Sequence, residues 1–494
     1  MPQNDPLRKA PAPSAPPLPS PPAPARPWLV VLAACAGQFL VVLDVSVMNV
    51  ALPSLKADLG LSTLELQWVL NAYSIAFAGF MLLGGRAADL YGRKAMFLLG
   101  LGLFTAASAV GGIAPEGQYL IGARAAQGLG AALLAPATLT LITGAVPAGA
   151  ARTRAIGTWT AVGAAGGAAG GFVGGLLVDL LSWRWVLLIN VPIGVLVLAA
   201  GVLWLRESRT AAGRRLDLPG AVLVTAGLAA LAYGIVQTEM AGWTAPDTLL
   251  PLLGGLALLA VFVVVESRTG EPLVPLGIFR NRAVSAANAA ILLCGSSSFA
   301  MWFFMTVYAQ SVLGYTPLQA GLALIPSSIS VLLGSKFAPH LMPVVGARNL
   351  AVIGALLAAA GFAWQSTLTA DGTFLGTILG PGVLMMAGIG LATTPLATLA
   401  TSSASPGDAG LVSGLVNTSR TMGGALGLAT LTTVAAAVAA TAPAVPYSSY
   451  GLAPDFSYLV PGYAMAFRVS ACVLVASAAL MLLWLPKEPA RRGA

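Results

Sequence analysis

The amino-acid sequence predicts an all-α, polytopic membrane protein, and three observations support that fold class. Of the 494 residues, 57% are hydrophobic and only 9% are charged, whereas soluble globular proteins carry about 25% charged residues. The mean hydropathy is +0.86. The apolar residues fall into runs of about 20, the length that a helix needs to cross about 30 Å of hydrocarbon.

Residues 1–27 precede the first apolar run and are rich in Pro and Ala. Such a composition cannot build a core, so we expect a disordered cytoplasmic tail. The apolar run that follows continues for about 25 residues, which is too long for a cleaved signal peptide.

Fourteen apolar runs follow the tail, and their short connections require neighbouring spans to be antiparallel. We expect an N-terminal six-helix bundle at 28–206, two inserted linker helices with cytoplasmic flanks at 207–282, a C-terminal six-helix bundle at 283–486 and a cytoplasmic C-terminus at 487–494. The spans are expected near 28–53, 67–86, 95–114, 118–144, 156–180, 184–205, 218–238, 247–265, 283–309, 318–337, 349–369, 374–401, 411–440 and 467–485.

The basic residues predict the orientation of these spans, since cytoplasmic loops of membrane proteins are enriched in Lys and Arg. With both termini in the cytoplasm, twenty of the 25 basic residues lie on cytoplasmic segments, and only Lys56, Arg184 and Arg468 lie outside. Arg124 and Arg420 fall within spans. The net charge of +8 therefore reflects topology, because the basic residues form no continuous stripe that could bind nucleic acid.

A weak internal repeat relates the two six-helix bundles. The segment GRAADLYGRK after the second span is loosely matched by SKFAPHLMPVVGAR after the tenth. In this match Lys336 falls at the place of Arg86, and Arg348 at the place of Arg93. Repeated halves of this kind recur in transporters.

Asp44 is the only acidic residue that the sequence places within the membrane, away from the ends of a span, in the stretch LDVSVMNVALP. A carboxylate at the bilayer centre costs about 2.5 kcal/mol or more, so an intramembrane acid is functional by default. Burial disfavours the ionised form and allows proton binding near neutral pH, whereas a cation bound nearby opposes it. Asp44 therefore predicts a site where protons and a cationic substrate compete.

Arg124 is the expected partner of Asp44. One face of its helix carries Arg124, Gln127, Gly128 and Ala131, so the arginine looks into the bundle past small residues. A guanidinium cannot lose its proton and would favour the ionised form of the acid. A purely structural clamp is the alternative.

A cytoplasmic turn carries the sequence GGRAADLYGRKAM after the second span. Gly85 and Gly92 permit close helix approach and a tight turn, while Asp89, Arg93 and Lys94 can pair across it. If this turn served only to fix the membrane topology, that role would explain the two basic residues but not the acid and the glycines at this spacing.

With this turn the chain resembles the major facilitator superfamily, whose signature in the loop is Gly, an Asp four residues later, and then Gly-Arg-Lys/Arg. More narrowly, it resembles the fourteen-helix drug:proton antiporter subfamily over nearly the whole chain after the tail. The resemblance implies a major facilitator fold, proton and cation handling by Asp44, and a coupling role for Arg124. It rests on LDVSVMNVALP, RAAQGLGAALLAP, SWRWVLLINVPIG, EPLVPLGIF and GLVNTSRTMGGALG.

The fifth span is rich in glycine. Each glycine in a helix costs about 0.5–1 kcal/mol relative to Ala, so three closely spaced pairs predict contact between backbones. The antiporter signature of the resembled subfamily has a Pro where this chain has a Gly, so a glycine hinge would have to serve instead at that position. The pairs are Gly166 and Gly167, Gly170 and Gly171, and Gly174 and Gly175, with Gly171 at the place of the Pro.

A cavity for varied apolar substrates would need aromatic, Met and polar side chains. Packing against lipid or at the interface is the alternative for each of them, and the two residues at 417 and 420 could equally form a gate or a structural brace. The candidates, which include part of the aromatic run at 299–308, are Phe39, Trp68, Asn71, Tyr73, Gln127, Trp302, Phe303, Tyr308, Met385, Asn417 and Arg420.

Together these features predict a proton-coupled secondary transporter of the cell membrane that exports amphipathic drugs or antibiotics, neutral or monocationic, by alternating access. We expect a monomer in the lipid bilayer that is no enzyme and is driven by the proton gradient without cofactor or metal. A dedicated exporter of one self-made antibiotic or metabolite stays open as the alternative. An ATP-driven pump is disfavoured because the chain lacks G-x-x-x-x-G-K-[ST], and a membrane enzyme because His340 is the only histidine.

Overall fold

The computed structural model describes residues 27–147, 150–208, 217–270, 272–403, 409–441 and 457–486, and the regular structure in these ranges is entirely helical. Fourteen helical segments in this part of the chain are long and apolar enough to cross a membrane, which confirms the predicted fold class. The predicted terminal segments lie outside the described residues, except for Pro27.

The helices fall into three groups along the chain. The N-terminal half contains α1 (Pro27–Leu59), α2 (Thr63–Tyr91), α3 (Arg93–Gly112), α4 (Gly117–Ala145), α5 (Ala150–Leu180), α6 (Arg184–Leu188) and α7 (Asn190–Trp204). The inserted pair is α8 (Leu218–Ala241) and α9 (Pro246–Arg268). The C-terminal half contains η1 (Leu276–Arg280), α10 (Arg282–Val307), η2 (Tyr308–Val312), α11 (Pro317–Val345), α12 (Ala347–Gln365), η3 (Phe374–Leu379), α13 (Gly380–Ser402), α14 (Ala409–Ala439), η4 (Ser457–Leu459) and α15 (Val460–Trp484).

Several helices are longer than their predicted spans; α1 continues to Leu59 instead of 53, and α11 continues to Val345 instead of 337. The sixth span is divided into α6 and α7 at Ile189. The last span begins at Val460 instead of near 467. The predicted span began next to Arg468, which was counted as lying outside the membrane, but a long basic side chain can extend from inside a helix toward the membrane surface.

Equivalent helices of the two halves begin with the same capping arrangement. The Ser62 hydroxyl accepts a hydrogen bond from the backbone of Glu65, whose side chain reaches back to the start of α2. Thr316 and Gln319 form the same capping box at the start of α11. This arrangement satisfies backbone N–H groups that have no partner within the helix.

The connections between α2 and α3 and between α11 and α12 also repeat. Gly92 and Gly346 both stand at positive φ, 116° and 85°, in conformations that side chains rarely adopt. Lys94 donates to a carbonyl in the last turn of α7, and Arg348 donates to the equivalent carbonyl of α15. The structural counterpart of Arg348 is therefore Lys94, and the predicted match with Arg93 is wrong by one residue.

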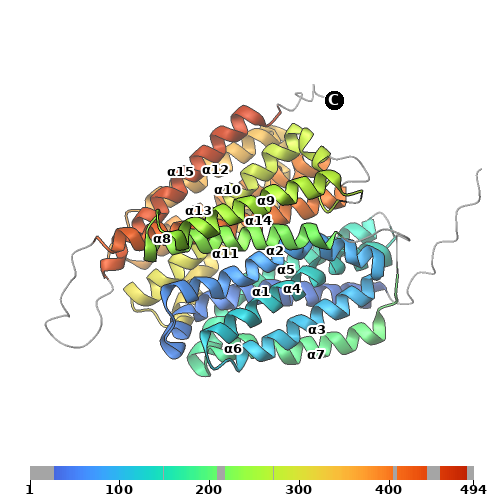
Figure 1. Ribbon diagram of the computed structural model, residues 1–494, viewed down its shortest axis with the longest axis horizontal. Helices are drawn as coiled ribbons and strands as arrows, with labels where there is room; N and C mark the ends of the chain where they lie inside the picture. Colours follow the sequence, from blue (N-terminus) through green and yellow to red (C-terminus); the bar gives the residue numbers. More distant parts are fainter. Residues whose placement is uncertain are drawn as a thin grey trace, which may run out of the picture.

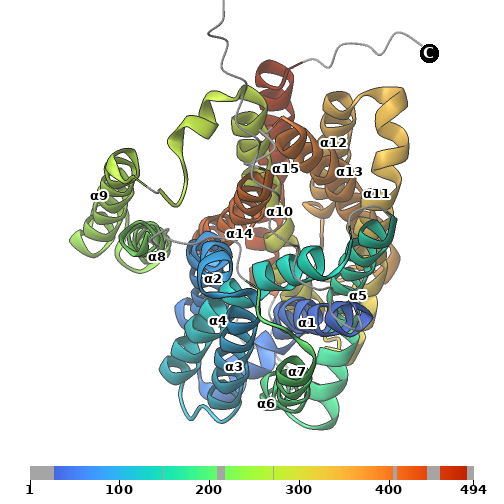
Figure 2. The same ribbon diagram turned by 90° about the vertical axis from the view of Figure 1, so that its right-hand side faces the viewer.

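The two halves lie side by side, and the inserted pair packs on the outside of their contact (Figures 1 and 2). Helix α8 pairs with α9 and also contacts α2 of one half and α14 of the other. The rings of Trp68 and Tyr233 meet there with centroids 6.2 Å apart. The inserted helices thus cover one edge of the contact between the halves.

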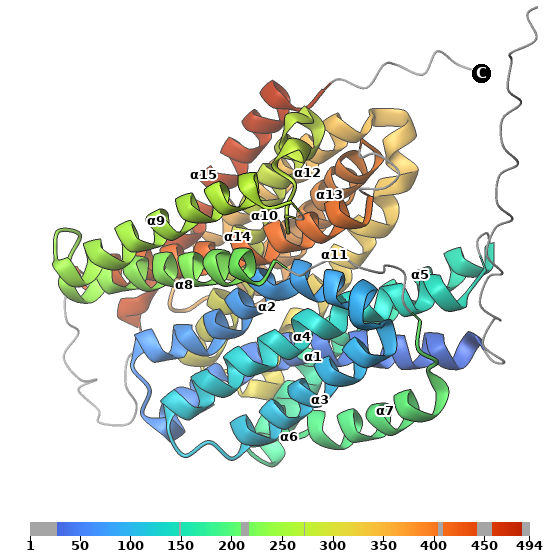
Figure 3. The ribbon, with the colours of Figure 1, turned by 45° about the vertical axis from the view of Figure 1, so that its right-hand side comes forward.

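The halves meet along two pairs of helices, α2 with α14 and α5 with α11. At the end where α1 finishes, Gln310 Nε2 donates to the carbonyl of Val50 at 2.9 Å. Toward the opposite end, where α1 begins and α15 finishes, the ribbons of the two halves diverge (Figure 3). The structure therefore has one end closed by contacts between the halves.

Candidate proton-coupling site

Asp44 lies on α1 and is fully buried inside the N-terminal half. Its Oδ2 accepts a hydrogen bond from Arg124 Nη1 at 2.5 Å. Its Oδ1 accepts from Gln127 Nε2 at 3.1 Å and from Asn190 Nδ2 at 2.9 Å. Three donors, one of them permanently charged, stabilise the ionised carboxylate in this conformation.

Arg124 is 1% exposed, and its guanidinium is held on several sides. Besides Asp44, it donates from Nε to the carbonyl of Val69 at 3.1 Å and from Nη1 to Gln127 Oε1 at 2.9 Å. Its central carbon lies 4.4 Å from the centroid of the Tyr73 ring. The structure thus brings together the acid and the arginine that the sequence pairs, and it adds Tyr73 beneath the arginine.

The site joins five helices. Ser108 of α3 accepts a hydrogen bond from Gln127 Nε2 at 2.7 Å and donates to the carbonyl of Phe104 at 2.8 Å. The polar groups form one connected network inside the N-terminal half. Its other members are Asp44 on α1, Val69 and Tyr73 on α2, Arg124 and Gln127 on α4, and Asn190 on α7.

Asn190 is the member of the network that sequence analysis missed. It is the first residue of α7 and is fully buried. Pro192 follows in the same turn, and since Pro has no N–H group and crowds the preceding turn, a break such as that between α6 and α7 is expected there. In the sequence, the signal for this residue was an Asn two positions before a Pro in an otherwise apolar span.

Three N-terminal candidates for the substrate cavity have different surroundings. Trp68 packs against α8, on the edge of the contact between the halves. Asn71 is 1% exposed, and its side-chain amide has no hydrogen-bond partner among the described residues. Phe39 is partly buried, and its carbonyl approaches Gly166 of α5. Their contact with substrate stays a prediction.

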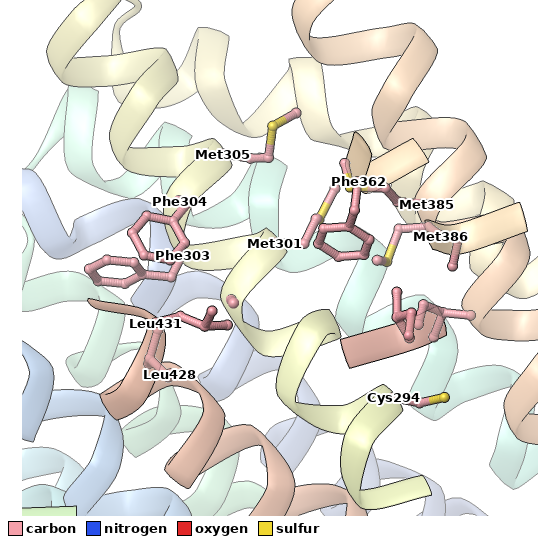
Figure 4. Close-up of a cluster of buried hydrophobic side chains, with 14 of the residues drawn as sticks. Cys294, Met301, Phe303, Phe304, Met305, Phe362, Met385, Met386, Leu428 and Leu431 are labelled. Atoms are coloured by element: carbon pink, nitrogen blue, oxygen red, sulfur yellow. The ribbon is translucent and has the colours of Figure 1, made fainter. Parts of the chain in front are cut away.

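Three C-terminal candidates, Phe303, Tyr308 and Met385, are buried in a hydrophobic core that also includes residues of the N-terminal half. Figure 4 shows Phe303 and Met385 among the neighbouring Phe and Met side chains of this core. Tyr308 donates its hydroxyl to the carbonyl of Thr369 at 2.7 Å. Trp302 packs against the same core and is only partly buried. In this conformation the first three are core residues, and a role in binding would require them to become accessible.

The glycines of α5 form two rows that face different helices. Gly166, Gly170 and Gly174 face α1, where added side chains would meet Phe39, Ser46 and Val47. On the other face, a Cβ on Gly171 would stand 3.0 Å from the carbonyl oxygen of Gly321, and one on Gly175 would stand 2.5 Å from the Cα of Leu318. The second row therefore lets α5 touch α11 of the other half.

The turn between α2 and α3 is organised by a residue that the motif does not contain. Glu207, in the segment after α7, accepts hydrogen bonds from the backbone N–H groups of Lys94 and Ala95 at 3.2 and 3.0 Å. A carboxylate at this place satisfies the free N–H groups at the start of α3. The side chain of Asp89 lies outside the described residues, so its predicted pairing with Arg93 stays a prediction.

Arg420 and Asn417 lie on α14, in the C-terminal half. Arg420 is exposed, although Thr418, Ser419 and Thr421 beside it are buried. Asn417 is partly buried. The structure keeps Arg420 apart from the Asp44 network, which lies wholly within the other half.

The fold and the site define a membrane transporter built from two related helical halves, with a buried acid–arginine pair in the first half. The chain belongs to the Major Facilitator Superfamily, whose sequence profile matches residues 34–428. It is therefore a multi-pass membrane protein, as its composition predicts.

Sequence relatives agree with this assignment. The chain is 50% identical over 422 residues to the cephamycin export protein CmcT of Amycolatopsis lactamdurans, a match that covers 85% of this chain and 87% of the relative. It is 38% identical over 459 residues to the puromycin resistance protein pur8 of Streptomyces alboniger, and this match covers 92% of this chain and 90% of the relative. Both relatives fit the expected drug:proton antiporter subfamily.

A solved structure shares the fold. The bacterial homologue of the human lysosomal transporter Spinster, in an inward-facing and unoccupied conformation, superposes with a TM-score of 0.68 at 17% sequence identity, over 93% of this chain and 97% of that one. At this identity the similarity concerns the fold alone.

Proposed function

We propose that the protein exports amphipathic antibiotics or drugs across the cell membrane in exchange for protons, by alternating access. The observation that carries this proposal is the buried Asp44 carboxylate, which Arg124, Gln127 and Asn190 hold inside an otherwise apolar bundle. An intramembrane acid of this kind is expected to bind and release a proton. Both termini would lie in the cytoplasm, the side on which most basic residues fall.

A proton that binds to Asp44 would weaken the hydrogen-bond network inside the N-terminal half. A neutral Asp44 attracts Arg124 less strongly and needs an acceptor for its own proton. The Oδ1 of Asn190 has no partner among the described residues, so rotation of its amide would supply that acceptor. Because Asp44 is fully buried, substrate does not reach it in this conformation, and coupling would pass through the movement of Arg124 and its helix.

An exporter of a single self-made antibiotic or metabolite is the second candidate. It is favoured by the 50% identity to a cephamycin export protein over most of both chains. An efflux panel separates the two candidates, since a dedicated exporter should move one compound class only.

The first test is export of a monocationic dye by proteoliposomes, with the pH gradient and the membrane potential collapsed separately. A monocation that leaves as one proton enters moves no net charge, so only the pH difference drives it, at about 1.4 kcal/mol per pH unit. Asp44→Asn should abolish gradient-driven export, while Asp44→Glu should keep part of it. Unimpaired export by Asp44→Asn would show that the proton binds elsewhere.

This test needs a control for folding. Asp44→Asn leaves Arg124 buried without a counter-charge, which should lower the free energy of unfolding by about 3–5 kcal/mol. Adding Arg124→Gln should recover much of that stability without restoring export. Export that returned with stability would assign Asp44 a structural role only.

The turn between α2 and α3 would act as a cytoplasmic gate, with Gly85, Asp89, Gly92, Arg93 and Lys94 holding that side closed when the transporter faces outward. Asp89→Asn should then reduce transport and leave substrate binding largely intact. Dye binding in detergent together with vesicle export measures both quantities. Binding lost from a folded variant would count against a gating role.

A further inference from the structure

Arg420 occupies an unusual place for an exposed charge. It lies about three turns after the start of α14, well inside a predicted span, and the residues on either side of it are buried. Helix α14 contacts α10, α13 and α15 of its own half, α2 of the other half, and α8. Because α14 contacts both halves and a charge that faced lipid would be costly, the exposed side chain is expected to face the space between the two halves.

Among the described residues, the guanidinium of Arg420 has no ion-pair partner, since the pairs of Asp44 with Arg124 and of Asp58 with Arg184 do not include it. Its side chain makes no hydrogen bond to another described residue either, whereas Arg124 uses its guanidinium on three partners. A fixed positive charge inside the membrane with no partner among the described residues suits an anionic ligand, because a guanidinium binds carboxylates through two parallel hydrogen bonds.

An aromatic ring packs against α14 one turn along the helix from Arg420. Gly295 lets α10 approach the backbone of Arg420, since any side chain there would collide with the Arg420 carbonyl. One turn further along α14, a Cβ on Gly424 would stand 2.6 Å from the ring of Phe299. Phe299 is partly exposed. The contact between α10 and α14 therefore presents an apolar ring and a cation to the same space.

We propose that Arg420 and Phe299 form the binding point for amphipathic substrates that carry a carboxylate, with the guanidinium binding the carboxylate and the ring contacting the apolar body. This proposal rests on the export function above and changes its expected substrate class from neutral or monocationic to anionic. A gate or brace formed by Arg420 is the competing role.

The substrate charge has a consequence for the driving force. An anion that leaves while a proton enters moves two elementary charges in the same electrical direction. A negative interior therefore assists anion export through both charges, whereas exchange of a monocation for one proton is indifferent to the potential.

The test uses three dansyl probes that differ mainly in charge: dansylglycine (an anion), dansylglycinamide (neutral) and dansylcadaverine (a cation). Binding to the full-length protein in detergent is followed by probe fluorescence for wild type, Arg420→Gln and Arg420→Lys. Arg468→Gln is the matched control, because Arg468 is also exposed but lies on α15, which packs on α12, α10 and α14. Melting temperatures verify that each variant is folded.

Wild type should bind dansylglycine more tightly than dansylglycinamide. Arg420→Gln should weaken dansylglycine binding about ten- to one-hundredfold and leave the other two probes unchanged. Arg420→Lys should retain part of the preference, and Arg468→Gln all of it. Equal losses for all three probes in a folded Arg420→Gln variant would assign a gate or brace and overturn the proposal, as would a wild type without preference for the anion.

Vesicle export separates this proposal from the proposed function. If wild-type vesicles export probes in response to a proton gradient but do not distinguish dansylglycine, the anion site is wrong and proton-coupled export stands. If the anion preference in binding is present but no probe is exported under a gradient, the binding site stands and proton-coupled export is wrong. Export of dansylglycine should slow when the membrane potential alone is collapsed.

Discussion

Asn190 offers a test of the proposed proton site. Its Nδ2 donates to the Asp44 carboxylate at 2.9 Å. Asn190→Ala removes this donor, and the loss of a hydrogen bond to a charged group costs about 1.5–3 kcal/mol. If Asp44 binds the coupling proton, the dependence of the export rate on pH should therefore change.

The control for this prediction is Ser108→Ala. Ser108 belongs to the same network but contacts Gln127 instead of Asp44, so its removal should move the profile less. Export rates measured over a pH series in proteoliposomes give both profiles. Identical profiles for wild type and Asn190→Ala would exclude a role for Asn190 in proton binding.

At the scale of helices, the closed end depends on close contact between α5 and α11. A Cβ on Gly321 would collide with the carbonyl oxygen of Gly171, so Gly321→Ala should push the two helices apart. The variant should favour an outward-open state and reduce export. A cysteine at Leu318, in a background without native cysteines, should then react several-fold faster with an impermeant maleimide added from outside.

The matched control is Gly122→Ala on α4, where an added Cβ meets nothing within 4 Å. It should leave both labelling and export close to wild type. If Gly321→Ala labels no faster than this control, the contact between Gly171 and Gly321 does not hold the outer end closed.

The contact with α11 also gives a reason for Gly171, which replaces the Pro of the antiporter signature. A glycine there leaves the α11 carbonyl room to approach.

At the scale of the whole molecule, the predicted topology places the turn between α8 and α9 outside the cell. Gly242 in this turn has φ 81°, so a cysteine there would be strained, and the neighbouring Trp243, which is 68% exposed, is the better labelling site. Trp243→Cys should react with an impermeant maleimide in intact cells, while Arg206→Cys after α7 should react only after permeabilisation. Labelling of both from the same side would contradict the proposed orientation.

This experiment requires a cysteine-free background. Cys35 and Cys294 are buried, but Cys472 is exposed and would add signal. The loop position Gly213, another cytoplasmic choice from the topology, lies outside the described residues.

The sequence by itself determined the number of spans, the chemical identity of the proposed proton site and the pairing of Asp44 with Arg124. These properties follow from local quantities. The cost of placing a residue in hydrocarbon accumulates over about 20 neighbouring positions, and a lone acid among apolar residues is recognisable wherever its helix packs. The glycine-rich helix was predictable in the same way, because its cost must be offset by close contacts.

Only the tertiary structure decided which side chains meet. Asn190 reaches Asp44 across 146 positions of the chain, and Glu207 caps α3 across 113 and 112. It also divided the glycines of α5 between two partner helices, and it paired Arg124 while leaving Arg420 without an ion-pair partner among the described residues. A helix that is apolar on every side carries no amphipathic stripe to show which face turns inward. That rotation is fixed by packing against the other helices, which local sequence does not encode.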